Sequence, residues 1–324
     1  MTLNNRLIEA IIEHAQSNRN IANQLSDILS IGKEAVYRRL RDEVPFSFTE
    51  AGKIALALNI SLDQIVSVKS ENRGVFELQF PDSTDMVRDY THFFDYYIKL
   101  LTEVESYDNS KLMIVYNSLP PSCFLNYDEL FRFLLYKNVY QLKSDSTFAP
   151  YSEIPIPSQL SRKQHHIATL LRNIKSTFFI IDWTVFPSFI HEVQHFYKLG
   201  LLNLDEMKEI QKELNRAVDD LEGFTVSGCF PNGNKVMVYL SNIDFTSSHA
   251  YIEYGPYYFG HQVLFSMNMI MSQNPDICRK QKSWIDILIK YSTLISQSGE
   301  IERIRYMKTQ REYIANMTDL STFI

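Results

Sequence analysis

Hydrophobic positions in residues 1–66 recur at helical spacing and predict a bundle of short helices. Leu7 and Ile11 lie one turn apart, residues 21–29 carry a second apolar stripe, and a third helix is expected from Gly32. Two capping-box sequences predict the starts of a fourth and a fifth helix: Ser47–Glu50 and Ser61–Gln64. The pattern therefore predicts an all-α N-terminal domain.

The pattern changes beyond residue 75, where longer amphipathic stretches alternate with short apolar runs. Lys111–Tyr116 and Thr177–Asp182 are apolar runs typical of buried strands, and a strand meander is expected over 235–267. Helices are expected over residues 82–105, 120–141, 157–175, 186–200, 203–222, 276–296 and 299–316. This predicts a larger domain of α/β or α+β type, residues 75–324, whose topology the pattern leaves open.

Composition divides the chain at the same place. Residues 1–66 hold 3 aromatic side chains, whereas the remaining 258 residues hold 39. The polar stretch 67–74 ends in glycine and lacks apolar periodicity, so we interpret it as a linker. Aromatic side chains usually form core, although so many of them could also line a cavity for an apolar effector.

Several classes of protein are disfavoured by residues that the chain lacks. It has only 10 glycines and no G-x-G-x-x-G dinucleotide fingerprint, and its 3 cysteines are scattered with no C-x-x-C pair. No signal peptide begins the sequence, and its apolar runs are far shorter than the roughly 18 residues of a membrane span. We therefore expect a reduced, cytoplasmic setting, no cofactor and no membrane partner.

Residues 21–41 have the pattern of a helix-turn-helix. The first helix turns Leu25 and Leu29 inward, and Ile31 fills the turn. The second helix directs Val36 and Leu40 toward the same core. Its opposite face is then left free to contact a partner.

This segment resembles the Cro and phage-repressor-like (XRE-type) helix-turn-helix family, whose pattern is roughly L-A-x-x-L-G-I-S-x-x-x-V-x-x-x-L. The chain reads Leu25-Ser26-x-x-Leu29-Ser30-Ile31-Gly32-x-x-x-Val36-x-x-x-Leu40. It departs from the family at Ser26, where alanine is preferred, and exchanges the usual glycine and serine at Ser30 and Gly32. The resemblance covers residues 5–66 and implies a sequence-specific transcriptional regulator that binds double-stranded DNA as a two-fold dimer.

The family resemblance also implies which side chains contact DNA, because its second helix enters the major groove. The candidates for base edges are Lys33, Glu34, Tyr37 and Arg38. The candidates for phosphates are Arg39, Arg41, Arg19 and Asn20. Residues 1–66 are close to neutral, with 7 basic and 8 acidic side chains, but residues 33–41 carry four basic and one acidic.

A competing motif lies in the second domain. His191-Glu192-Val-Gln-His195 matches H-E-x-x-H, which on a helix places two histidines on one face for zinc and a glutamate as general base. A catalytic zinc needs a third protein ligand, and no recognisable motif supplies one. A zinc-dependent peptidase fused to the helix-turn-helix is therefore an alternative, as is a protein-interaction module that does not bind DNA.

The last two expected helices carry an apolar stripe. Its members are Trp284, Ile285, Leu288, Tyr291 and Leu294. They either form a dimer interface or pack within the chain. The function we expect is a regulator without enzymatic activity, whose C-terminal domain mediates homodimer formation, senses a small-molecule effector, or does both.

Overall fold

The computed structural model describes residues 2–15, 21–58, 60–66, 76–79, 86–142, 149–154, 156–264 and 269–319. Arg19, Asn20 and the linker expected over 67–74 lie outside these residues. Contacts within the chain group it into two units, Met1–Val75 and Phe76–Ile324. The described helices and a mixed sheet make an α+β fold. In the described parts, no helix has the length and apolar character needed to span a membrane.

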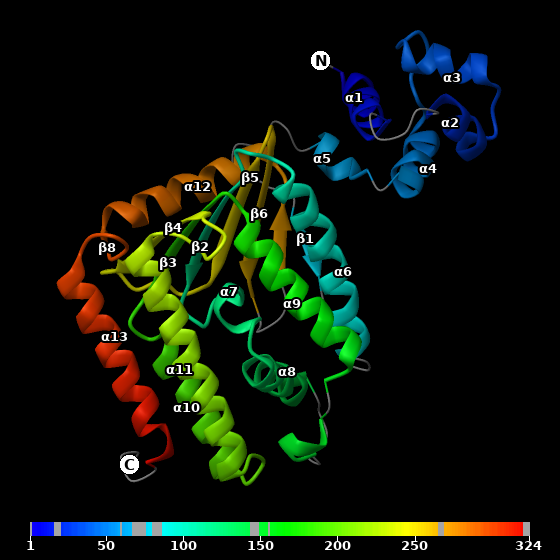
Figure 1. Cartoon of the computed structure of the whole chain (residues 1–324). Helices are drawn as coiled ribbons and strands as arrows, with labels where there is room; N and C mark the ends of the chain where they lie inside the picture. Colours follow the sequence, from blue (N-terminus) through cyan, green and yellow to red (C-terminus); the bar gives the residue numbers. More distant parts are fainter. Residues whose placement is uncertain are drawn as a thin grey trace. The chain divides into compact units, whose positions relative to one another are not determined.

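The first unit consists of short helices around a small apolar core (Figure 1). Ile11, Leu25 and Val36 are fully buried in this core and come from three different helices. Because isolated helices this short are marginal in water, these contacts stabilise the helical conformation. The helices are α1 (Leu3–Ala15), α2 (Ile21–Leu29), α3 (Lys33–Leu40), α4 (Phe48–Leu58) and α5 (Leu62–Val66).

Two serines shape the turn between α2 and α3. Ser30 has a backbone φ of 55°, in the left-handed region that glycine adopts most easily. The hydroxyl of Ser26 donates to the carbonyl of Ile31 at 2.6 Å, and the Ile31 N–H donates to the Ser26 carbonyl at 3.2 Å. Ser26 and Ser30, two of the three positions that depart from the pattern described above, therefore act in this turn, and the Ser26 hydrogen bond closes it.

Among the described residues of the second unit, eight strands form one sheet in the order β1-β7-β6-β5-β2-β3-β4-β8. β2, β3 and β4 are parallel to one another, and the other neighbouring strands are antiparallel. The strands are β1 (Glu77–Gln79), β2 (Lys111–Tyr116), β3 (Ser176–Ile181), β4 (Lys235–Ser241), β5 (His249–Tyr254), β6 (Tyr257–Val263), β7 (Met269–Ser272) and β8 (Ser292–Leu294).

The meander expected over 235–267 is confirmed for β5 and β6, which pair with each other, and is wrong for β4. β4 pairs with β3 and β8, whereas β5 lies between β2 and β6. The expected helix over 276–296 is too long, since the helix ends at Lys290 and Ser292–Leu294 pairs with β4. These differences have one cause, which is long-range strand pairing.

The helix expected over 120–141 is two helices. Its second part begins at Asp128, where the Glu213 carboxylate accepts the backbone N–H groups of Glu129 and Leu130 at 2.8 and 3.1 Å. A side chain distant in sequence thus satisfies N–H groups that a helix start leaves unpaired. The helices of this unit are α6 (Met86–Glu105), α7 (Pro121–Phe124), α8 (Asp128–Leu142), α9 (Ser158–Asn173), α10 (Val185–Lys198), α11 (Leu204–Ser227), α12 (Pro275–Lys290) and α13 (Glu300–Ala315), with short 3-10 turns at Tyr151–Glu153 and Asn316–Thr318.

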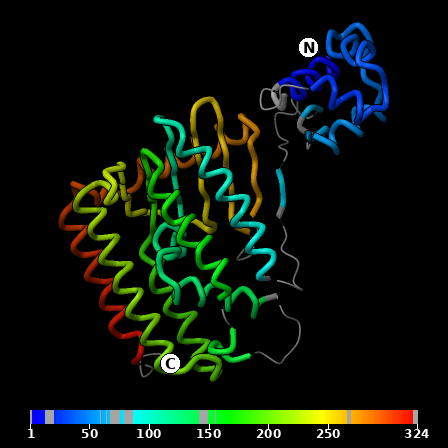
Figure 2. The backbone as a smooth tube through the Cα atoms, turned by 45° about the vertical axis from the view of Figure 1, so that its right-hand side comes forward, coloured from blue at the N-terminus to red at the C-terminus, as the bar shows by residue number. Residues whose placement is uncertain are grey.

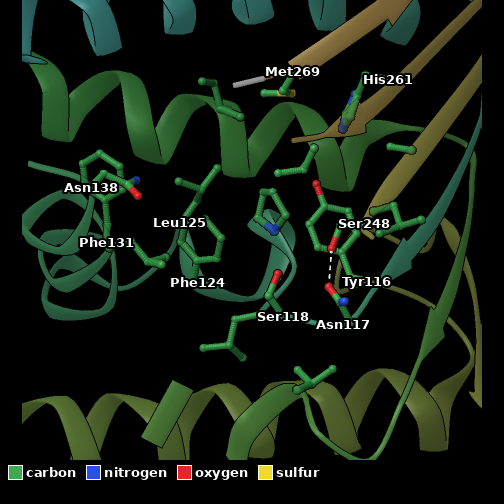
Figure 3. Close-up of a pocket in the computed structure, with 18 of the residues that line it drawn as sticks. Tyr116, Asn117, Ser118, Phe124, Leu125, Phe131, Asn138, Ser248, His261 and Met269 are labelled. Carbon is green, nitrogen blue, oxygen red and sulfur yellow. Dashed lines mark hydrogen bonds between the residues drawn. The ribbon is translucent and has the colours of Figure 1, made fainter. Parts of the chain in front are cut away.

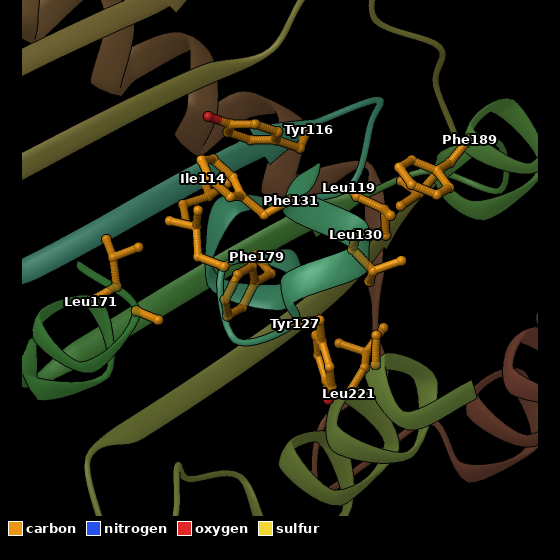
Figure 4. Packing of buried hydrophobic residues seen from close by; sticks show 14 of the residues in the cluster. Ile114, Tyr116, Leu119, Tyr127, Leu130, Phe131, Leu171, Phe179, Phe189 and Leu221 are labelled. Atoms are coloured by element: carbon orange, nitrogen blue, oxygen red, sulfur yellow. The ribbon is translucent and has the colours of Figure 1, made fainter. Parts of the chain in front are cut away.

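Helices cover both faces of the sheet. On one face Met113 and Val115 of β2 pack with Ile285 and Leu288 of α12. Alternate residues of β2, including Ile114, point to the other face and enter the main core with side chains of α6 to α11 (Figure 4). On this side α6 lies along α9, and α11 lies along α13 (Figure 2).

Replacing Ser30 with glycine should stabilise the first unit. Glycine adopts the positive φ of this position without the steric penalty of a Cβ atom, so we expect a gain of about 0.5–1 kcal/mol. Amide hydrogen exchange in α2 and α3 of the full chain measures this gain as slower exchange. The Ser30→Ala variant keeps the Cβ atom and should show no gain. Equal exchange rates in the glycine variant and the wild type would contradict the assigned backbone geometry.

Candidate functional site

One face of α3 presents the side chains that the sequence assigns to base edges. Lys33, Glu34, Tyr37 and Arg38 are all exposed. Val36 is fully buried on the inner face, against α2 and the rest of the small core. The helix is therefore anchored on one side and free on the other, as a groove-binding helix requires.

Arg39 is separated from the other basic side chains of α3. Its Nη2 lies 2.8 Å from Glu50 Oε1, its Nη1 donates to the Ala35 carbonyl at 3.1 Å, and its side chain is only 18% exposed. Burial tends to raise the pKa of Glu50, but hydrogen bonds from Ser47 and Arg39 hold it below its ordinary value. Arg39 thus joins α3 to α4, in contrast to the phosphate contact expected of it.

Arg38 and Arg41 share an acidic neighbour that the sequence analysis missed. Glu43 Oε2 lies 3.5 Å from Arg38 Nε, and Glu43 Oε1 lies 3.3 Å from Arg41 Nη1. All three side chains are about half exposed, so these ion pairs are weak and screened by salt. The short spacing between Arg41 and Glu43 in the sequence could have indicated the ion pair between them.

The H-E-x-x-H motif lies on α10, where it does not form a metal centre. His191 and His195 are exposed, and the Glu192 carboxylate binds Lys137 Nζ at 2.8 Å. Within the part of the chain that the structure describes, no three His, Cys, Asp or Glu side chains are grouped so as to hold a metal ion. The geometry therefore gives no support to the zinc-peptidase alternative.

The second unit encloses a cavity of about 380 Å³ between the sheet and its main helical layer. The loops 117–119 and 246–248 line it, and the first of these follows the carboxyl end of β2. Ligands of open α/β sheets bind at this end of the parallel strands. The volume falls within the range of about 300–1,000 Å³ that is usual for small-molecule sites.

Two polar side chains in the largely apolar lining have unsatisfied atoms. His261 Nδ1 lies 2.7 Å from the Tyr97 hydroxyl, but His261 Nε2 has no hydrogen-bond partner among the described residues. Asn138 Nδ2 donates to the Tyr90 hydroxyl at 2.6 Å, and its Oδ1 is likewise unsatisfied there. Figure 3 shows Asn138 and His261 on opposite sides of the cavity. Each residue is only 5% exposed.

The cavity also has polar groups that are paired with one another. The Ser248 hydroxyl donates to Asn117 Oδ1 at 2.9 Å, which joins the two lining loops (Figure 3). Neither Asn138 nor His261 was selected from the sequence. The local sequence offers no signal that singles them out, because Lys137 directly precedes Asn138 and Gln262 directly follows His261.

Burial fixes the protonation state at the His261 end of the cavity. It lowers the pKa of His261 to about 3, with a smaller effect from His249, so the imidazole is neutral near pH 7. Burial also raises the pKa of Tyr97 well above its ordinary value, so this hydroxyl keeps its proton. The Tyr97 hydroxyl lies 2.7 Å from Nδ1 and 3.9 Å from Met269 Sδ, so we assign its hydrogen to Nδ1, which leaves the imidazole hydrogen on Nε2. His261 then offers an unused hydrogen-bond donor.

Comparison of the chain with protein-family profiles, curated proteins and solved structures finds no match.

The His261→Phe variant should lose less stability in acid than the wild type. The ordinary pKa of 6.5 applies to the unfolded chain, whereas folded His261 stays neutral down to about pH 3. Between pH 3 and pH 6.5 the unfolded state binds more protons than the folded state. The free energy of unfolding of the wild type therefore decreases by up to about 1.4 kcal/mol for each pH unit of acidification. Urea unfolding followed by the fluorescence of Trp183 and Trp284, both in the second unit, measures the slope. Equal slopes in the two proteins would refute the assignment.

Proposed function

We propose that this chain is a sequence-specific DNA-binding transcriptional regulator. The observation that supports it best is the division of α3 into two faces. Val36 and Arg39 hold its inner face to the first unit. Lys33, Tyr37 and Arg38 are presented together on its outer face. Exposed basic and hydrogen-bonding side chains on an anchored helix are the chemistry that reads base edges.

In this proposal the first unit is a helix-turn-helix bundle of the XRE type, and α3 is its recognition helix. The Arg38 guanidinium can donate two hydrogen bonds to guanine O6 and N7, and Glu34 can accept one from cytosine N4. Arg41 is assigned to the phosphates, as are Arg19 and Asn20, which lie outside the described residues. We propose a cytoplasmic location for this regulator, as expected from its sequence.

We also propose that the regulator acts as a homodimer through its second unit. Ile285 and Leu288 of the apolar stripe pack within the chain, and Leu294 lies in β8. Trp284 and Tyr291 remain 38% and 59% exposed. Further exposed apolar residues on α12 and α13 are Ile287, Ile301 and Ile304. Apolar surface of this kind is common at interfaces between subunits.

Sequencing the genomic fragments retained by the purified full chain tests the proposed function. We expect a recurring motif with two inverted halves about 10–10.5 base pairs apart, or a multiple of this spacing, as two-fold binding on successive major grooves requires. Retention without enrichment of any sequence, even at low salt, would overturn the proposal. That result would favour the protein-interaction alternative.

The Arg38→Ala variant should bind the retained motif about 5–150-fold more weakly than the wild type, because each good base contact contributes about 1–3 kcal/mol. Electrophoretic mobility shift or fluorescence anisotropy measures the affinity. Arg162→Ala removes an exposed arginine from α9, outside the proposed dimer helices α12 and α13, and is the matched control, with unchanged affinity expected. If Arg38→Ala binds as tightly as this control, Arg38 has no part in recognition.

The Glu43→Gln variant should bind DNA about 2–5-fold more tightly at low salt. Its carboxylate pairs with Arg38 and Arg41 in the free protein and competes with DNA phosphates for them. The gain should fade as salt is added, since exposed charges are screened. Glu9→Gln removes the same charge from α1 and controls for net charge. Equal gains in both variants would argue against a specific competition.

A further inference from the structure

The cavity of the second unit combines an apolar lining with polar atoms that lack partners. Its walls include Tyr90, Phe93 and Phe94 of α6, together with Ile114 of β2 on the opposite wall. A buried polar atom without a hydrogen bond costs about 1–3 kcal/mol, and a protein retains few of them. His261 Nε2 and Asn138 Oδ1 are two such atoms among the described lining residues of one cavity.

The two unsatisfied atoms have opposite hydrogen-bonding roles. His261 Nε2 carries a hydrogen when Tyr97 donates to Nδ1, so it can only donate. Asn138 Oδ1 is a carbonyl oxygen and can only accept, while the amide nitrogen donates one of its hydrogens to the Tyr90 hydroxyl. A molecule that satisfies both needs an acceptor at one end and a donor at the other.

The charge of the lining selects against ions. The charged side chains in its described part are Lys137 and Glu192, which neutralise each other at 2.8 Å. His261 is neutral in this setting. An ion transferred into such surroundings would lose its hydration and gain no unpaired opposite charge.

We propose that this cavity binds a neutral, elongated, largely apolar small molecule that accepts a hydrogen bond from His261 and donates one to Asn138. A carbonyl or ether oxygen fits the His261 end, and a hydroxyl or amide N–H fits the Asn138 end. The proposal that such a molecule binds depends only on the structure of the cavity. The further step, in which this molecule is the effector that changes DNA affinity, rests on the function proposed above.

Fluorescent naphthalene probes test the site in the full chain. Prodan is a neutral naphthalene ketone whose emission shifts to the blue in apolar surroundings, and we expect saturable binding to one site. His261→Phe should weaken Prodan binding about 3–10-fold, the value of one hydrogen bond. The same variant should leave the affinity for dimethylaminonaphthalene, which lacks the ketone, unchanged. His195→Phe, on the exposed face of α10, is the matched control and should change neither affinity.

The other end of the cavity is tested by changing the probe. Replacing the dimethylamino group of Prodan with a hydroxyl adds a donor, which should raise the affinity for wild type about 3–10-fold. Asn138→Leu should abolish that gain while it leaves Prodan binding in place. Circular dichroism of each variant serves as the control that it is folded.

A steric variant keeps the proposal testable if His261→Phe does not fold. Ser188 lies on α10 at an exposed edge of the lining, so Ser188→Trp narrows the cavity without disturbing the core. We expect all three probes to lose at least tenfold in affinity. The proposal is overturned if no probe binds saturably, or if binding is unaffected by the cavity variants. Probe binding without DNA retention would refute the regulatory function and leave the site intact.

Discussion

The first unit depends on the anchoring of α3, a helix of eight residues that could not persist alone in water. Val36 is fully buried with Leu25 and Ile54 in the small core. The Arg39–Glu50 ion pair joins the same side of α3 to the start of α4. Val36 and Arg39, which hold α3 to the rest of the unit, both lie on its inner face. The fold therefore does not depend on the side chains of its outer face. Its side chains are free for recognition chemistry.

The same constraint explains what local sequence could predict. Apolar periodicity identified the inner face of α3 and, by elimination, the exposure of Lys33 and Arg38. It could not distinguish Arg39 from its neighbours, because the role of Arg39 depends on Glu50, which approaches only through tertiary packing. The Ser47–Glu50 capping box was predictable because both of its hydrogen bonds are local.

In the second unit, pattern alone located β2 and most of the long helices but not their arrangement. The pairing of β4 with β3 joins segments far apart along the chain, and no local period encodes it. The start of α8 is capped by Glu213, which is equally remote. The sequence could not identify Asn138 and His261 as a pair, because only the folded chain places both in the lining of one cavity. The two proposed sites thus use polar groups differently: the first has exposed side chains on α3, and the second has the buried Asn138 and His261, each with one unpaired atom.

Amide hydrogen exchange of the full chain, with and without its retained DNA, tests whether α3 contacts DNA. We expect slower exchange in peptides covering Lys33–Arg41 on DNA binding, since contact with the groove restrains α3 and excludes water. Peptides covering α11, Leu204–Ser227, which does not line the cavity, should be unaffected by DNA. Protection confined to Phe76–Ile324, with none in α3, would contradict the assignment of α3 as the DNA-binding element.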